Sequence, residues 1–113
     1  MTQPTERTAP AHQRYEALID EAAHATGILP TIDDCRRLER DLVRALGDLV
    51  GCVRVLQDRL PRDADGWRAC ERALLDAQAA LCGGMGLGLR SAALHVATLG
   101  QAARQLADCI RRG

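Results

Sequence analysis

Apolar side chains recur at every third or fourth position from residue 35 to residue 60. The stripe consists of Cys35, Leu38, Leu42, Ala45, Leu49, Cys52, Leu56 and Leu60, and Leu46, Val50 and Val53 widen it. This spacing matches the period of an α-helix and predicts one long amphipathic helix, which Thr31 or Asp33 caps and Pro61 ends. The stripe is wider than a coiled-coil seam, so the helix is expected to pack in a globular bundle.

Three further segments carry a helical pattern. An alanine-rich face predicts a weaker helix over residues 11–25. A third helix begins near Asp63 or Asp65 as its cap, and its stripe consists of Trp67, Cys70, Leu74, Ala77 and Leu81. The last helix runs from about Leu89 to Arg111, and its small residue Gly100 lets a neighbouring helix come close. The glycine-rich stretch 83–88 connects the last two helices, because glycine is costly inside a helix.

These elements predict an all-α fold, an antiparallel bundle of three helices with a weaker fourth helix at the N-terminus. Residues 1–10 are polar and contain two prolines, so we expect a flexible tail followed by one domain over residues 11–113. The alternative is a three-helix bundle whose N-terminal arm is detached and pairs with another chain.

Charge and cysteine usage exclude several classes of protein. The chain carries fifteen basic and fifteen acidic residues and a formal net charge of zero, which disfavours nucleic acid as a partner. It has no apolar run long enough to span a membrane and no secretory signal pattern. Its five cysteines form no CxxC motif and are expected to be reduced thiols, which suits a cytoplasmic location.

No catalytic, metal or cofactor site is expected from the residue pattern. Glu21 and His24 have the spacing of a di-iron ligand pair, but both fall away from the apolar face and are interpreted as solvated. Cys35 lies in the first turn of its helix beside two arginines, which is the setting of a reactive thiol, but it also begins the buried stripe. His95, at the edge of the last helix's core face, is expected to bond a carbonyl or carboxylate.

A few side chains indicate a binding pocket or a contact with a partner protein. Trp67, Cys70 and His95 are the candidate lining of a pocket between helices, because a core without phenylalanine either packs tightly or leaves room for a ligand. Leu94 falls on the polar face of the last helix and Leu75 at the edge of the third. The two leucines hint at a patch that faces a partner.

The order of features from Leu38 to Ile110 is similar to that of a known group. The segments that carry the similarity are LPRDADGWRACERALLDAQAAL, CGGMGLGL and RSAALHVATLGQAARQLADCI. They resemble a small actinobacterial family of unknown function, whose members are often described as natural-product-biosynthesis proteins. The resemblance implies a context in specialised metabolism and no particular reaction.

The leading hypothesis is a non-catalytic interaction or accessory protein that forms a homodimer or binds a protein partner. The alternative is a small-molecule-binding protein or minor enzyme of natural-product biosynthesis, with a pocket between helices. A regulatory protein that contacts nucleic acid through the arginines of the long helix is a third hypothesis. It is disfavoured because those arginines alternate with acidic residues.

Overall fold

The computed structural model describes residues 11–25, 31–84 and 88–112. These residues form the helices α2 (Ala11–Arg14), α3 (Glu16–Ala23), α4 (Ile32–Asp58), α5 (Asp65–Cys82) and α6 (Leu89–Arg112), and they include no strand. The predicted all-α class is therefore confirmed. The predicted tail over residues 1–10 and the middle of the 83–88 connection lie outside the described residues.

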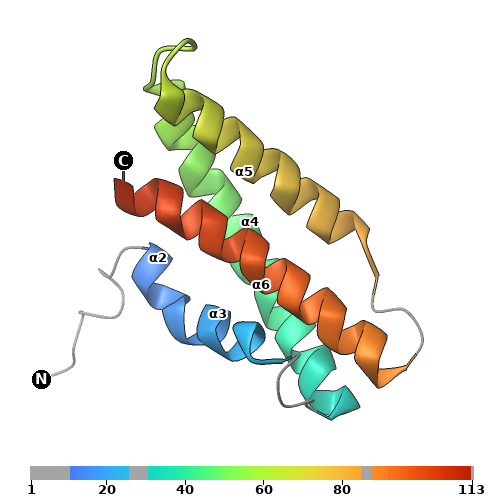
Figure 1. The fold of residues 1–113 in the computed structure, drawn as a ribbon. Helices are drawn as coiled ribbons and strands as arrows, with labels where there is room; N and C mark the ends of the chain where they lie inside the picture. The colour runs from blue at the N-terminus through green and yellow to red at the C-terminus, as the bar shows by residue number, and fades with distance from the viewer. Residues whose placement is uncertain (1–10, 26–30, 85–87, 113) are drawn as a thin grey trace, which may run out of the picture.

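The centre of the bundle is the pair α4 and α6. Helix α5 packs along one side of this pair, and α2 and α3 pack along the other side (Figure 1). Consecutive long helices run in opposite directions, so α5 is antiparallel to both α4 and α6. The N-terminal helices therefore complete the predicted four-helix arrangement on their own chain and do not form a detached arm.

The core combines leucines from the central helices with small side chains from the outer ones. The fully buried large side chains of the central pair are Leu38, Leu42, Leu46, Leu49, Val53, Val96, Leu99 and Leu106. Helix α5 turns Cys70, Ala73, Ala77 and Ala80 toward them. Small residues let the helix axes approach closely, which favours close packing although no fully buried side chain is aromatic in the described residues.

Two members of the predicted stripes are exposed. Cys52 is exposed and Val53 takes its place in the core, while Leu81 is 40% exposed and Ala80 lies inside. For Cys52 the reason is geometric, because a straight helix drifts by about 20° per heptad relative to a 3.5-residue repeat. Over the length of α4 this drift carries the series Leu38, Ala45 and Cys52 to the edge of the helix interface.

The predicted helix over residues 11–25 is divided at Tyr15, where the structure corrects the prediction. Tyr15 has φ −106° and ψ 6°, outside the α-helical well, and separates α2 from α3. Its hydroxyl donates a hydrogen bond to the Asp48 carboxylate on α4. This bond, followed by burial, raises the pKa of Tyr15 above its ordinary value. The bend therefore coincides with a tertiary contact that anchors the N-terminal segment.

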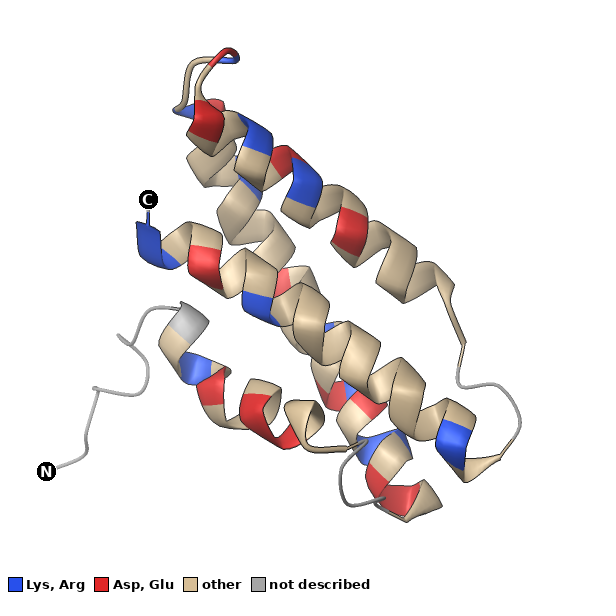
Figure 2. Cartoon of the chain, in the orientation of Figure 1, with Lys and Arg blue, Asp and Glu red and all other residues tan. Residues whose placement is uncertain are grey.

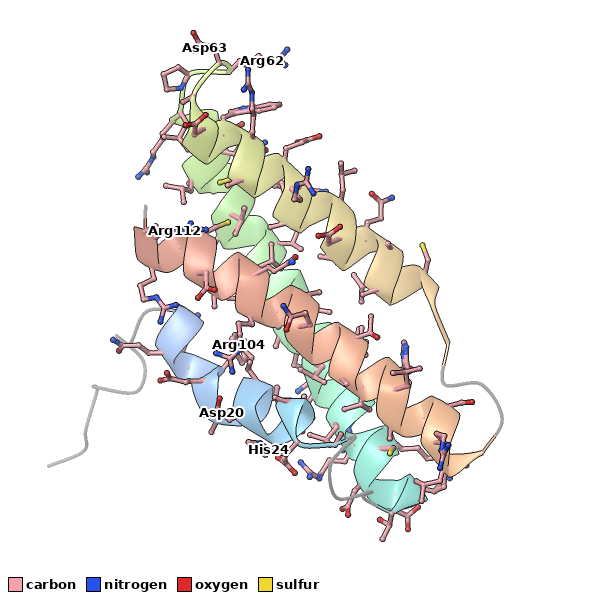
Figure 3. The ribbon with its side chains drawn as sticks, viewed as in Figure 1. Asp20, His24, Arg62, Asp63, Arg104 and Arg112 are labelled. Carbon is pink, nitrogen blue, oxygen red and sulfur yellow. The ribbon has the colours of Figure 1, made fainter. Side chains whose placement is uncertain are left out.

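Helix α3 is docked by one close contact and two ion pairs. A Cβ added to Gly100 of α6 would lie 2.6 Å from the Cβ of Ala22, so the predicted close approach at Gly100 is confirmed. Arg104 of α6 donates to Asp20 of α3 at 2.8 Å (Figure 3), and Arg37 of α4 pairs with Glu21. The docking thus combines small apolar side chains with exposed charges.

The two long helices at the chain's middle begin differently. Thr31, one of the two predicted caps, accepts a bond from the Asp34 amide at 3.0 Å, and the Asp34 carboxylate accepts one from the Thr31 amide at 3.4 Å. Neither Asp63 nor Asp65 caps α5, since Ala64 is its N-cap residue and makes no side-chain bond. Asp65 instead lies in the first turn, where the helix dipole favours an acidic residue.

Replacing Thr31 with alanine is expected to destabilise the protein by about 1 kcal/mol, because the Asp34 amide at the start of α4 loses the hydroxyl oxygen that accepts its hydrogen bond. Urea denaturation followed by circular dichroism measures the change. Thr31→Ser keeps the hydroxyl oxygen and is the matched control. An alanine variant as stable as the parent would contradict the assigned capping box.

Candidate functional site

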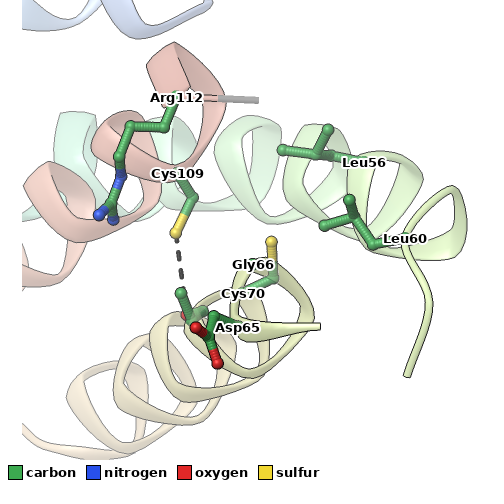
Figure 4. A pocket seen from close by; sticks show the side chains of 8 residues that line it. Leu56, Leu60, Asp65, Gly66, Cys70, Cys109 and Arg112 are labelled. Atoms are coloured by element: carbon green, nitrogen blue, oxygen red, sulfur yellow. Dashed lines mark hydrogen bonds between the residues drawn. The ribbon is translucent and has the colours of Figure 1, made fainter. Parts of the chain in front are cut away.

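The end of the bundle where α4, α5 and α6 meet holds a pocket of about 330 Å³ (Figure 4). Its lining residues are Leu56, Leu60, Asp65, Gly66, Ala69, Cys70, Cys109 and Arg112. The wall is mostly apolar, with the thiols of Cys70 and Cys109 on it and the charged groups of Asp65 and Arg112 beside it. The Cys109 thiol donates to the carbonyl of Ala69 at 3.8 Å. This pocket is at the lower limit of the size of small-molecule sites.

Trp67 lies one turn before Cys70 but lines a different hollow. That hollow, of about 450 Å³, is formed along α5 by Trp67, Arg68, Glu71, Arg72, Leu75 and Asp76. The indole is partly buried, and the guanidinium of Arg62 lies 5.7 Å from the ring centre. Trp67 is therefore a partly buried side chain in the first turn of α5, with one face covered by a cation.

His95 is held at the opposite end of α6 from the end pocket. Its Nε2 lies 3.1 Å from Oε2 of Glu39 on α4, and the residue is 8% exposed. The prediction that this histidine bonds a carboxylate is confirmed. A shallow depression of about 400 Å³ beside it includes Gly83, Gly84 and Leu94, and Leu94 is 61% exposed.

The structure does not bring Trp67, Cys70 and His95 into one pocket. Because α5 and α6 are antiparallel, the first turns of α5 lie beside the last turns of α6, far along the bundle from His95. Cys70 consequently faces Cys109, and His95 faces the beginning of α4. The predicted pocket is divided into three separate hollows, of which the end pocket is the best enclosed.

The buried thiols are in settings that oppose nucleophilic chemistry. Burial is the main cause that raises the pKa of Cys35, with Asp34 adding to it, so the neighbouring arginines do not activate this thiol. Burial also raises the pKa of Cys70, and the thiol of Cys109 contributes. Within the described ranges, no three histidine, cysteine or acidic side chains are placed to hold a metal ion.

In the native protein, a maleimide reagent at neutral pH is expected to label Cys52 and Cys82 quickly. Both side chains are exposed, whereas Cys35, Cys70 and Cys109 are buried and should react only after unfolding. Mass spectrometry with and without denaturant counts the labels. A double Cys52→Ser and Cys82→Ser variant should lose the fast labelling, and fast labelling that persists in it would contradict the described burial.

A surface that the sequence did not predict lies between α4 and α5. We define the α4–α5 groove as the hollow of about 420 Å³ lined by Val50, Arg54, Gln57, Glu71, Leu74, Leu75, Gln78 and Leu81. Leu75 is 56% exposed and Leu81 is 40% exposed, and Val50 and Leu74 are partly buried beside them. Only Leu75 was singled out from the sequence, and the other leucines were assigned to the core. Charges of both signs alternate along the first part of α5, and its last part has none (Figure 2).

The chain thus forms a small helical bundle with an end pocket and with a groove of mixed polar and apolar side chains between α4 and α5. The chain belongs to a family of unknown function, DUF6415, which matches residues 9–112. Neither the curated proteins nor the solved structures that were compared contain a match to the chain. No helix in the described ranges combines the length and the apolar character needed to cross a membrane.

Proposed function

We propose that this protein is a non-catalytic binding module that contacts another protein chain through the α4–α5 groove. The observation that carries the proposal is the exposure of Leu75 and Leu81 on one continuous hollow together with Val50 and Leu74. Single exposed leucines are common on protein surfaces, but large apolar side chains that share a groove are typical of interaction sites.

The energetics favour coverage of this groove. Complete burial of a leucine side chain contributes about 1.5–3 kcal/mol of binding free energy. Leu75 and Leu81 are 56% and 40% exposed, so covering each of them with a partner contributes roughly half of that value. Polar groups at one end of the groove are already ordered, because Gln57 Nε2 donates to Glu71 Oε1 at 3.0 Å. A partner therefore meets these two side chains already in place, which lowers the entropy cost of ordering them on binding.

The chemistry of the described residues supports binding over catalysis. The buried thiols have raised pKa values, and the His95 side chain is occupied by Glu39. A nucleophile needs an adjacent base, and none of the buried cysteines is hydrogen-bonded to a histidine in the described residues. We place the module in the cytoplasm, as its free thiols suggest, and in the specialised metabolism of actinobacteria, as the resemblance in the sequence suggests.

Affinity capture with matched surface variants tests the proposal. Proteins captured by the parent chain should be lost with Leu75→Glu and retained with Val55→Glu, since Val55 is 54% exposed on α4 but does not line the groove. Circular dichroism of each variant confirms that the bundle is folded. A parent chain that captures nothing and does not self-associate would overturn the proposal, and so would capture that Leu75→Glu leaves unchanged.

A second candidate function is the binding of a small, mainly apolar molecule in the end pocket. It is favoured by the mainly apolar wall of leucine, alanine and cysteine. The Arg112 guanidinium at its edge suits an anionic group of a ligand, provided that this group lies away from the Asp65 carboxylate, which lines the same pocket. Thermal-shift screening of short-chain carboxylic acids tests it. Binding by the parent that is lost in Cys70→Phe, a change that fills the pocket, supports this function, and no shift with any of the acids contradicts it.

A further inference from the structure

We infer that the occupant of the α4–α5 groove is the same groove of a second copy of this chain. The inference rests on the proposed function and names the partner. In the arrangement that the geometry favours, a two-fold axis runs along the groove, parallel to the helices. The α4 helix of each copy then lies over the α5 helix of the other.

Helix direction is the first reason. Helices α4 and α5 are antiparallel within one chain. Rotation about an axis parallel to them preserves the direction of each helix, so α4 of one copy faces α5 of the other in the antiparallel sense. Every neighbouring pair among the four helices is then antiparallel, which is the arrangement of up-and-down four-helix bundles. This symmetry is closed and uses one surface on each copy.

The register of the two helices is the second reason. The bond between Gln57 and Glu71 places these residues at the same level of the groove. Counting from this level in opposite directions along the antiparallel helices, Gly47 of α4 lies level with Leu81 of α5. In the dimer, Leu81 of one copy therefore meets Gly47 of the other.

The glycines of α4 leave room for these leucines. A Cβ added to Gly47 or to Gly51 would meet no atom within 4 Å. The uncovered backbone at Gly47 and Gly51 forms a shallow notch on α4. This notch can receive Leu81 and Leu75 of the facing α5 helix. Exposed glycines in a helix interior cost stability, and the dimer gives both of them a packing role.

Charge complementarity is the third reason. Arg54 and Glu71 stand on opposite walls of the groove, about one helical turn apart in level. In the part of the chain that the structure describes, Arg54 makes no ion pair. The two-fold rotation exchanges the walls and keeps the levels, so Arg54 of each copy lies about one helical turn from Glu71 of the other. Long side chains span such an offset, and the pair forms twice.

Charge reversal gives a sharp test by sedimentation velocity. Arg54→Glu and Glu71→Arg are each expected to weaken self-association about tenfold or more, because each places like charges opposite one another. A mixture of the two single variants should form heterodimers, since both facing pairs then have opposite charges. The double variant R54E/E71R should regain the self-association of the parent.

Gly47→Gln separates dimerisation from folding. The substitution fills the notch, its Cβ meets no atom of its own chain within 4 Å, and it replaces glycine with a better helix former. In dilute solution, where both chains are monomers, the variant should therefore unfold at a temperature at least as high as the parent. It should nevertheless be monomeric at concentrations where the parent is dimeric. Leu94→Glu, on the exposed face of α6, is the matched control and should leave the dimer unchanged.

The outcomes distinguish this inference from the proposed function. A dimer that responds to Gly47→Gln and to the charge variants as described supports the inference. A monomer that captures a different protein through the groove overturns the inference and leaves the proposed function standing. A dimer that is insensitive to Gly47→Gln and to both charge reversals also overturns it, whereas a chain that binds neither itself nor another protein overturns both.

Discussion

Truncation of Leu46 to alanine is expected to lower the free energy of unfolding by about 2–5 kcal/mol. Leu46 is fully buried in the middle of α4. The loss is expected in the upper part of this range, because alanines such as Ala73, Ala77 and Ala103 are buried in the same core and have no side-chain rotamers that could refill the space. Domains of this size are stable by only about 5–15 kcal/mol, so the variant should be close to unfolding.

Guanidinium denaturation followed by circular dichroism measures this loss. Val43→Ala is the matched control, because Val43 lies on the same helix and is 44% exposed, and its truncation should change the stability by about 0.5 kcal/mol or less. A loss below about 1 kcal/mol for Leu46→Ala would mean that the core can collapse around the missing atoms, contrary to the close packing described above.

Replacement of Gly100 by alanine is expected to have the second large effect. The new methyl group would lie 2.6 Å from the Cβ of Ala22, and both groups are attached directly to helix backbone, so α3 has to move away from α6. Overpacking of this kind costs about 1–3 kcal/mol. The displacement also weakens the bond between Arg104 and Asp20, which joins the same two helices.

Gly51→Ala is the matched control for Gly100→Ala. Both changes replace a helical glycine and gain about 0.8–1.0 kcal/mol of helix propensity, but a Cβ at Gly51 meets open space. In dilute solution, Gly51→Ala should therefore stabilise the protein, and the difference between the two variants reports the contact with Ala22 alone. Hydrogen exchange should rise in α2 and α3 of Gly100→Ala, and adding Ala22→Gly should reverse the effect. Unchanged exchange in α3 would contradict the close contact.

The long helices were predicted well from the sequence because residues close to their ends determine where these helices begin and end. Pro61, the glycines before Leu89 and the cap at Thr31 act within a few residues of the helix ends. The break at Tyr15 was not predictable, since it coincides with a bond to Asp48, which is distant in the chain. The exposure of Cys52 follows from helix drift and could have been predicted from a stricter count of the helical period.

The candidate site was predicted less well, because its residues come from different helices and their relative positions depend on how these helices pack. Antiparallel connection of α5 and α6 already implies that Trp67 and His95 lie at opposite ends, so the proposed common pocket conflicted with the predicted fold. The α4–α5 groove had a weaker signal. Its lining depends on the rotation of two helices about their axes, and only the packed structure reveals that Leu75 and Leu81 remain exposed beside Val50.

The way in which α3 is docked gives the molecule two parts of unequal strength. The side chains of its ion pairs to Arg37 and Arg104 are 40–59% exposed, so dissolved salt screens these pairs. The leucine contacts between α4 and α6 are buried and uncharged, so salt does not screen them. We therefore expect added salt to weaken the docking of α3 by at most about 1 kcal/mol for each exposed ion pair, and to leave the packing of α4, α5 and α6 unchanged. Any local opening at high ionic strength should begin with the N-terminal segment and uncover the strip of α6 around Gly100.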